Sequence, residues 1–234
     1  MPRRSAMSDK KTYGRAMLIF VISVFAILAA VLIIPQSRAV FEKLSADQPY
    51  IMGFIKFALL ATSGELIAIK MATGKFAKPA YLTARIVIWG IIGVWITYMM
   101  KIFFLGSGAM MAVGLLPGGT LATDSFGYKL IRAFATAATM NLTFGPTFMA
   151  VHKCSDTYLA LREKCGRGVK LSEVIDAVDW KRFVSFTIFK TVPIFWIPAH
   201  TITFLLPSEY QVMLAALLSV ALGIILNLKK KGAK

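Results

Sequence analysis

Long runs of apolar residues alternate with short, mostly basic segments along the whole chain. A helix that crosses the hydrocarbon of a bilayer needs roughly 20 mostly apolar residues. Five runs meet this requirement plainly or nearly, and a sixth does so more weakly. Together they cover residues 16–34, 50–69, 86–105, 130–151, 183–206 and 210–228, of which 130–151 is the least hydrophobic. The pattern predicts an all-α fold: a polytopic integral membrane bundle of about six transmembrane helices.

The distribution of positive charge gives these helices a direction. Cytoplasmic loops of membrane proteins carry an excess of lysine and arginine. Of the 27 lysines and arginines, 20 fall in residues 1–15, 70–85, 152–182 and 229–234. These segments share one side of the membrane if six helices cross it, and the opposite side then holds five. The charge pattern therefore predicts that both termini are cytoplasmic.

The expected organisation is a basic N-terminal tail with an extra transmembrane anchor at residues 1–36, followed by a membrane helical domain at 37–234. The charged start, the apolar run and the small residues around Arg38 also resemble a secretory signal peptide. The apolar run exceeds the 7–15 residues of a signal-peptide core. This length favours a retained anchor over a cleaved signal.

The cytoplasmic loop 152–182 is the longest segment outside the predicted spans. Within it, Ser172 can cap a helix whose apolar residues recur at helical spacing; they are Leu171, Val174, Ile175, Val178 and Phe183. Such a helix would either lie on the membrane surface and lead into the next span, or act as a lid or as a docking element for a partner.

The glycine-rich stretch 106–119 is apolar but only 14 residues long. This length suits a re-entrant or interfacial segment better than a transmembrane helix. Its glycines and Pro117 would interrupt a helix. We therefore expect an extended external loop that dips toward the membrane, with a plain flexible loop as the alternative.

Polar residues inside the predicted spans are the candidate functional residues. An ionisable group at membrane depth costs at least about 2.5–3.5 kcal/mol on insertion scales and commonly marks a functional site. The helix rise of 1.5 Å per residue places Glu65 and Lys190 at similar depths, so we expect them to pair if the second and fifth spans touch. Asn141 falls at a similar level. These residues, with His200, are the candidate lining of a pore or binding site.

Each of these residues also has a purely structural interpretation. Glu65 and Lys190 could form an ion pair that only joins two helices. His200 could be a hydrogen-bonded packing residue rather than a proton relay. Lys56, near the outer end of the second span, is expected to extend its ammonium group to the membrane surface.

Prolines in two spans are candidate helix breaks and gate elements. Pro193 and Pro198 lie in the fifth run, and Pro146 follows Gly145 in the fourth. A proline removes a backbone donor and frees carbonyl groups, which membrane proteins tolerate where they line a cavity or are buried in protein. The alternative is a kink that serves packing alone.

Composition and motifs exclude several classes of protein. Hydrophobic residues make up 57% of the 234 residues and charged residues 16%, which is atypical of soluble domains and of disordered chains. We attribute the net charge of +16 to orientation and to contact with anionic lipids, and expect no nucleic-acid partner.

The sequence contains no HExxH motif and no Walker loop, so neither an enzyme nor a cofactor is expected. Cys154 and Cys165 are expected to be free thiols, without a metal site.

The C-terminal third resembles a known family. Residues 190–226 are similar to the signature end of the 22-kDa peroxisomal membrane protein family and its mitochondrial inner-membrane relatives, with matching Pro198, Phe204, Pro207 and Tyr210. Residues 144–159 (FGPTFMAVHKCSDTYL) resemble the preceding helix of that family. Residues 63–65 (Ser-Gly-Glu) are similar to the Gly-Asp pair near the family's first helix, with Glu65 in place of the aspartate. Arg85 and Gly90 fit the start of the next helix.

The departures from the family pattern are typical of a distant branch, and we expect a bacterial one. Gln211 stands where the family has arginine, and Met140 and Asn141 stand where it has Asp-Gln. Members of this family are regarded as pores for small solutes in organelle inner membranes. The resemblance therefore implies a helical, pore-like protein.

The sequence thus predicts an integral membrane protein that passes small solutes or ions as a pore or channel. The alternative is a non-transporting scaffold or regulator that acts through the basic cytoplasmic loop. A substrate-specific secondary transporter is a third and more distant interpretation. The expected location is a bacterial cytoplasmic membrane, or alternatively an organelle inner membrane. The sequence does not identify the solute, and it leaves open whether the protein is a homo-oligomer.

Overall fold

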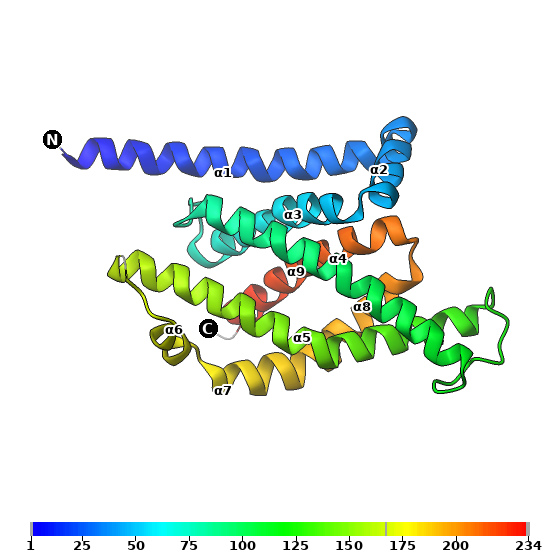
Figure 1. Ribbon diagram of the computed structural model, residues 1–234. Helices are drawn as coiled ribbons and strands as arrows, with labels where there is room; N and C mark the ends of the chain where they lie inside the picture. Colours follow the sequence, from blue (N-terminus) through cyan, green and yellow to red (C-terminus); the bar gives the residue numbers. More distant parts are fainter. Residues whose placement is uncertain (1, 167, 233–234) are drawn as a thin grey trace. The chain divides into compact units, whose positions relative to one another are not determined.

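The computed structural model describes residues 2–166 and 168–232, and these residues are mostly helical (Figure 1). Met1, Arg167 and residues 233–234, which belong to the predicted basic tails and the cytoplasmic loop, lie outside the described residues. In chain order the elements are α1 (Pro2–Ile33), α2 (Pro35–Asp47), α3 (Pro49–Thr73), α4 (Leu82–Ala112), α5 (Phe126–Cys165), α6 (Leu171–Ala177), α7 (Trp180–Arg182), η1 (Phe183–Trp196), α8 (Ile197–Leu205) and α9 (Ser208–Gly232).

Five helical stretches of the described residues are long and apolar enough to cross a membrane. They are Tyr13–Ile33, Pro49–Thr73, Leu82–Ala112, Trp180–Leu205 and Ser208–Ile225. This confirms an all-helical fold with the character of an integral membrane protein. The remaining predicted run, 130–151, lies within the 40-residue helix α5, which is less apolar than the other five.

Prolines, a glycine and a serine set several helix boundaries. Pro35 and Pro49 each stand in the first turn of α2 and α3, where a helix does not need the missing N–H group. Gly74 ends α3 in a left-handed conformation with φ 82°, which costs glycine little because it has no Cβ. Ser125 precedes α5, and its Oγ accepts a hydrogen bond from the backbone N of Tyr128 at 3.2 Å.

Two predicted interruptions are absent from the structure. α4 continues to Ala112, so the expectation that Gly106 and Gly108 interrupt a helix is wrong, and the loop begins after them. α5 runs through Pro146 without ending, so this proline is not a helix break. Membrane helices tolerate glycine and proline, because neighbouring helices and side chains can satisfy the backbone groups that these residues free.

The fifth predicted span does have an irregular backbone. η1 consists of π-helical turns, and the N–H of Ile197, just beyond it, bonds to the carbonyl of Val192 five residues earlier. Pro193 lies inside η1, whereas Pro198 falls in the first turn of α8. The chain passes from η1 directly into α8, so neither proline ends the helical stretch.

The predicted cytoplasmic loop, residues 152–182, is more helical than expected. α5 extends to Cys165, and α6 begins at Leu171. The predicted cap at Ser172 is wrong, because the Glu173 carboxylate instead accepts from the N–H of Lys170 at 2.7 Å. Val174 is buried and Leu171 is exposed, so only part of the predicted apolar stripe packs against the protein.

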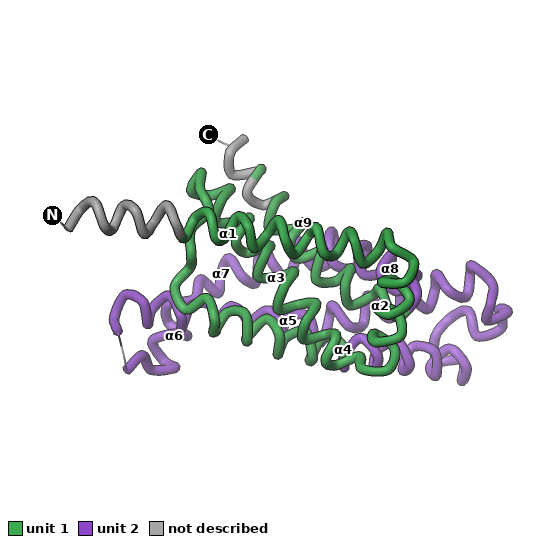
Figure 2. The backbone as a smooth tube through the Cα atoms, turned by 90° about the horizontal axis from the view of Figure 1, so that it is seen from above, with its two compact units in different colours: residues 1–97, 208–234 green, residues 98–207 purple. Residues whose placement is uncertain are grey.

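The chain divides into two compact units (Figure 2). Unit 1 comprises residues 1–97 and 208–234, and unit 2 comprises 98–207. In unit 1, α3 packs most extensively against α9, and α2 contacts α1, α3 and α9. In unit 2, α5 packs along α8 and also contacts η1 and α6. α4 begins in unit 1 and ends in unit 2.

Candidate functional site

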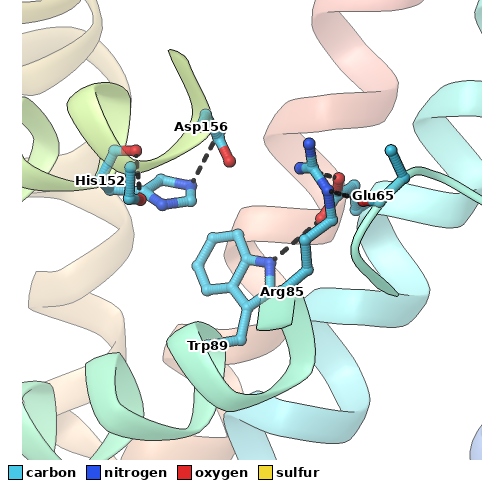
Figure 3. A network of polar contacts seen from close by, with 7 residues as sticks. Glu65, Arg85, Trp89, His152 and Asp156 are labelled. Carbon is cyan, nitrogen blue, oxygen red and sulfur yellow. Dashed lines mark hydrogen bonds and ion pairs between the residues drawn. The ribbon is translucent and has the colours of Figure 1, made fainter. Parts of the chain in front are cut away.

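Glu65 lies in a polar contact between α3 and α4 of unit 1. Its carboxylate accepts a hydrogen bond from Arg85 at 2.5 Å and lies 3.4 Å from the indole nitrogen of Trp89. Figure 3 shows the guanidinium and indole groups directed toward the carboxylate. The Nε of Arg85 also donates to the carbonyl of Ala80 at 3.0 Å, which ties this contact to the loop before α4.

The partner of Glu65 differs from the one expected from sequence. The depth argument pairs Glu65 with Lys190, but in the structure the bonded cation is Arg85, and Lys190 is an exposed residue of η1. The side chains of Glu65 and Arg85 keep 22% and 13% of their surface exposed. This ion pair is therefore held by protein on most sides and still reaches the surface of the unit.

Lys56 is enclosed by three elements of unit 1. Its Nζ donates to Ser45 Oγ at 2.8 Å and to the carbonyl of Glu209 at 2.9 Å, and it lies 4.4 Å from the centre of the Phe41 ring. The residue is only 7% exposed. The expectation that Lys56 extends to the membrane surface is wrong, because α2 and the start of α9 supply its partners inside the unit.

Asn141 and His200 meet in the interior of unit 2. Asn141 Nδ2 lies 2.9 Å from His200 Nδ1 and also donates to the carbonyl of Ala137 at 2.8 Å. Asn141 Oδ1 lies 3.2 Å from the same ring nitrogen. The indole of Trp196 stacks on the imidazole with ring centres 5.3 Å apart. Of the predicted site residues, these two are brought into direct contact.

The Asn141–His200 contact leaves one neighbouring donor without a partner. The indole Nε1 of Trp196 is buried and has no hydrogen-bond acceptor among the described residues. Buried N–H groups nearly always have a partner, which can be a water molecule or a ligand. The cluster of Asn141, Trp196 and His200 therefore contains one buried donor that is not used by the described residues.

Arg132 and His152 are polar residues that the sequence analysis did not select. Arg132 Nη2 and Nε donate to the carbonyl of Phe104 at 3.0 and 3.3 Å. His152 Nε2 lies 3.6 Å from Asp156 Oδ2, one turn along α5 (Figure 3). Arg132 is one of the five basic residues that the charge pattern places on the side opposite the cytoplasm, near the start of the predicted span 130–151. Within the described chain, no group of three His, Cys, Asp or Glu residues could hold a metal ion.

These features define a helical protein of the multi-pass membrane class, with polar groups inside each compact unit. Comparison with known proteins adds no name to that class: no family model, no curated protein and no solved structure matches the chain. The resemblance to the 22-kDa peroxisomal membrane protein family therefore stays a prediction from the sequence.

Proposed function

We propose that this chain is a pore for small solutes or ions. The proposal includes six crossings, with α5 as the sixth, and both termini on the cytoplasmic side of a bacterial membrane. The Glu65–Arg85 ion pair, whose side chains remain 22% and 13% exposed, is the observation that carries it. A charged pair within apolar helices is costly, and residual exposure reduces that cost where the pair borders a water-filled path.

Two further features support a wetted interior. The unpartnered indole N–H of Trp196 would find its acceptor in a water molecule or a passing solute. The wide turns of η1 around Pro193 are the kind of irregular backbone that occurs in membrane proteins next to cavities. The similarity to a family of small-solute pores points the same way.

The test is flux through liposomes that contain the purified protein, with both charges of the pair changed separately. Glu65→Gln leaves the cation of Arg85, so we expect permeation to shift toward anions. Arg85→Gln leaves the carboxylate of Glu65, so permeation should shift toward cations. The double variant should return to a selectivity near that of the unmodified protein.

A matched control comes from the exposed ion pair of the same unit. Asp47 pairs with Lys43 at 2.7 Å on α2, and Asp47→Asn removes one carboxylate there without touching the proposed path. We expect no change in selectivity from it. Tight vesicles with folded wild-type protein, or equal selectivity in both single variants, would contradict the pore.

A non-transporting scaffold is the second candidate, and the closed set of partners around Lys56 favours it. An ammonium group that is 7% exposed and bonded on both sides indicates a dry interior at that point. In a scaffold, the basic segment around α6 would recruit anionic lipid or a partner protein. Flux distinguishes the two candidates, because a scaffold leaves the vesicles tight.

A further inference from the structure

A pocket of about 230 Å³ lies within unit 2, where α4, α5 and α8 come together near the ends of these helices. It is smaller than the roughly 300–1,000 Å³ of sites that enclose drug-sized ligands. The lining consists of three apolar and four polar side chains: Phe104, Phe204, Leu205, Thr123, Tyr128, Lys129 and Arg132. This size suits a small ion or one headgroup rather than a large ligand.

The guanidinium of Arg132 is fixed in this pocket by its neighbours. Two of its nitrogens donate to the Phe104 carbonyl, and its Cζ lies 3.8 Å from the centre of the Phe104 ring. That ring stacks on Phe204 with centres 5.9 Å apart. The remaining amino group, Nη1, forms no hydrogen bond to a described residue and is available to a ligand.

Gly108 makes room for this guanidinium. A Cβ added at Gly108 would lie 2.8 Å from Nη2 and 2.9 Å from Cζ of Arg132. The arginine occupies the space that any larger residue would fill. An alanine at this position would therefore move the charge without removing it.

The charges around the pocket favour an anion. Lys129 and Arg132 contribute two cations, and no acidic residue is among the lining residues; Asp124, next to Thr123, is exposed and outside that set. The pocket also adjoins the N-terminus of α5, whose first turn holds no acid, so the positive end of the helix dipole adds to the attraction for an anion. The hydroxyl-bearing side chains of Thr123 and Tyr128 complete a set of donors.

We propose that this pocket binds a phosphoryl group. Arginine and lysine bind phosphate oxygens through charge-assisted hydrogen bonds. The stacked rings of Phe104 and Phe204 can cover the apolar part of an organic phosphate. The phosphoryl group comes either from a soluble phosphate or from the headgroup of an anionic lipid. The site stands whether or not the protein conducts solutes, because it depends on unit 2 alone.

The experiment measures binding to purified, delipidated protein in two arms. In the first, the unfolding temperature is measured with inorganic phosphate and with chloride at equal ionic strength. In the second, native mass spectrometry measures retention of phosphatidylglycerol against phosphatidylcholine. Lys129→Gln is compared with Lys153→Gln, which removes an exposed lysine elsewhere on α5. Gly108→Ala is compared with Gly106→Ala, since Gly106 faces open space.

A phosphate-specific rise in unfolding temperature identifies a soluble phosphate, and preferential retention of phosphatidylglycerol identifies a lipid headgroup. In either arm we expect about tenfold weaker binding in Lys129→Gln and in Gly108→Ala, as is typical for loss of one charge-assisted contact. The two control variants should bind like the unmodified protein. The proposal is overturned if neither ligand binds, or if all four variants bind alike.

Discussion

The side chain of Lys56 illustrates how this protein accommodates charge within apolar helices. An isolated ammonium group in hydrocarbon is costly, and Lys56 avoids that state by bonding to Ser45 and to the carbonyl of Glu209. The ring of Phe41 covers it on a further side. One buried cation thereby connects α2, α3 and α9 within unit 1.

Lys56→Met should destabilise the folded protein by about 1–3 kcal/mol, the usual cost of leaving buried polar groups without a partner. The hydroxyl of Ser45 and the carbonyl of Glu209 both lose their donor. Thermal unfolding in detergent, followed by the reactivity of the native cysteines, measures the effect.

Lys43→Met is the control for this prediction. Lys43 is exposed, and its hydrogen bond with Asp47 raises the pKa of its ammonium group, so it is charged at neutral pH like an ordinary surface lysine. Exposed ion pairs contribute little to stability. If both variants unfold at the same temperature as the unmodified protein, the partners assigned to Lys56 are wrong.

The Asn141–His200 contact leads to a prediction about a pair of residues. Asn141→Leu removes the partner of a buried ring nitrogen, and we expect a loss of about 1–3 kcal/mol. His200→Phe should cost a similar amount, because Asn141 then has an unmatched amide. The double variant should recover part of the loss, since two apolar side chains leave nothing unsatisfied. Additive losses in a double-mutant cycle would exclude a direct interaction.

Sequence identified Glu65, Asn141 and His200 but missed Arg85 as the partner of Glu65. Glu65, Asn141 and His200 stand out because each is polar within an apolar run. The expected pairing of Glu65 with Lys190 was based on equal depth along two helices, which does not show that the two helices are neighbours. The short connection between α3 and α4, residues 74–81, was the available signal, since short connections make consecutive helices neighbours and bring Arg85 close to Glu65.

At the level of elements, α3 and α4 approach each other through glycines. A Cβ at Gly93 would lie 2.2 Å from the carbonyl oxygen of Gly53 and 2.7 Å from Cβ of Phe57. Small residues let membrane helices approach closely, which strengthens packing where no hydrophobic force joins them. The contact involves backbone atoms, so no side-chain rotation relieves an added methyl group.

Gly93→Ala should therefore force α3 and α4 apart and cost about 1–3 kcal/mol, as overpacking usually does. Gly106→Ala, on the same helix but in open space, should be neutral or slightly stabilising, because alanine favours helix. The unfolding temperature and the yield of monodisperse protein report the difference. Equal behaviour of the two variants would mean that the helices are not in contact at Gly93.

Most helices of the fold could be predicted, and the exceptions have physical reasons. The apolar runs predict α1, α3, α4 and α9 because long hydrophobic stretches dominate all other signals. α2 was missed because it is short and amphipathic, with Phe41 and Ser45 buried and charged residues on its exposed side. The continuation of α5 to Cys165 was missed because its last turns are polar and resemble a loop.

At the level of the whole molecule, the crossing of α5 decides the topology. Its 40 residues span about 60 Å at 1.5 Å per residue, twice the hydrocarbon thickness of about 30 Å. If α5 crosses, residues before its start and residues at its end face opposite sides. The two native cysteines provide a label at that end, since Cys165 is exposed and Cys154 half-buried.

We expect a membrane-impermeant maleimide to label Cys165 from the cytoplasmic side. A cysteine introduced at the exposed Thr120, with both native cysteines replaced by serine, should be labelled from the opposite side. Right-side-out and inverted vesicles distinguish the two outcomes. Labelling of both positions from one side would place α5 along the membrane and reduce the number of crossings by one.

Only 11% of an 18-residue apolar stretch of α1 is buried, and this has a consequence for where the protein resides. The apolar run 16–33 of this helix has 18 residues and is about 27 Å long, close to the thickness of an average bilayer core. A helix that is covered by lipid rather than by protein is most stable where its apolar length matches the hydrocarbon thickness. In thicker, sterol-rich membranes the apolar part of this helix would be too short, and the free-energy cost of the mismatch grows with each ångström. We therefore expect the protein to partition into bilayers whose hydrocarbon core is close to about 30 Å.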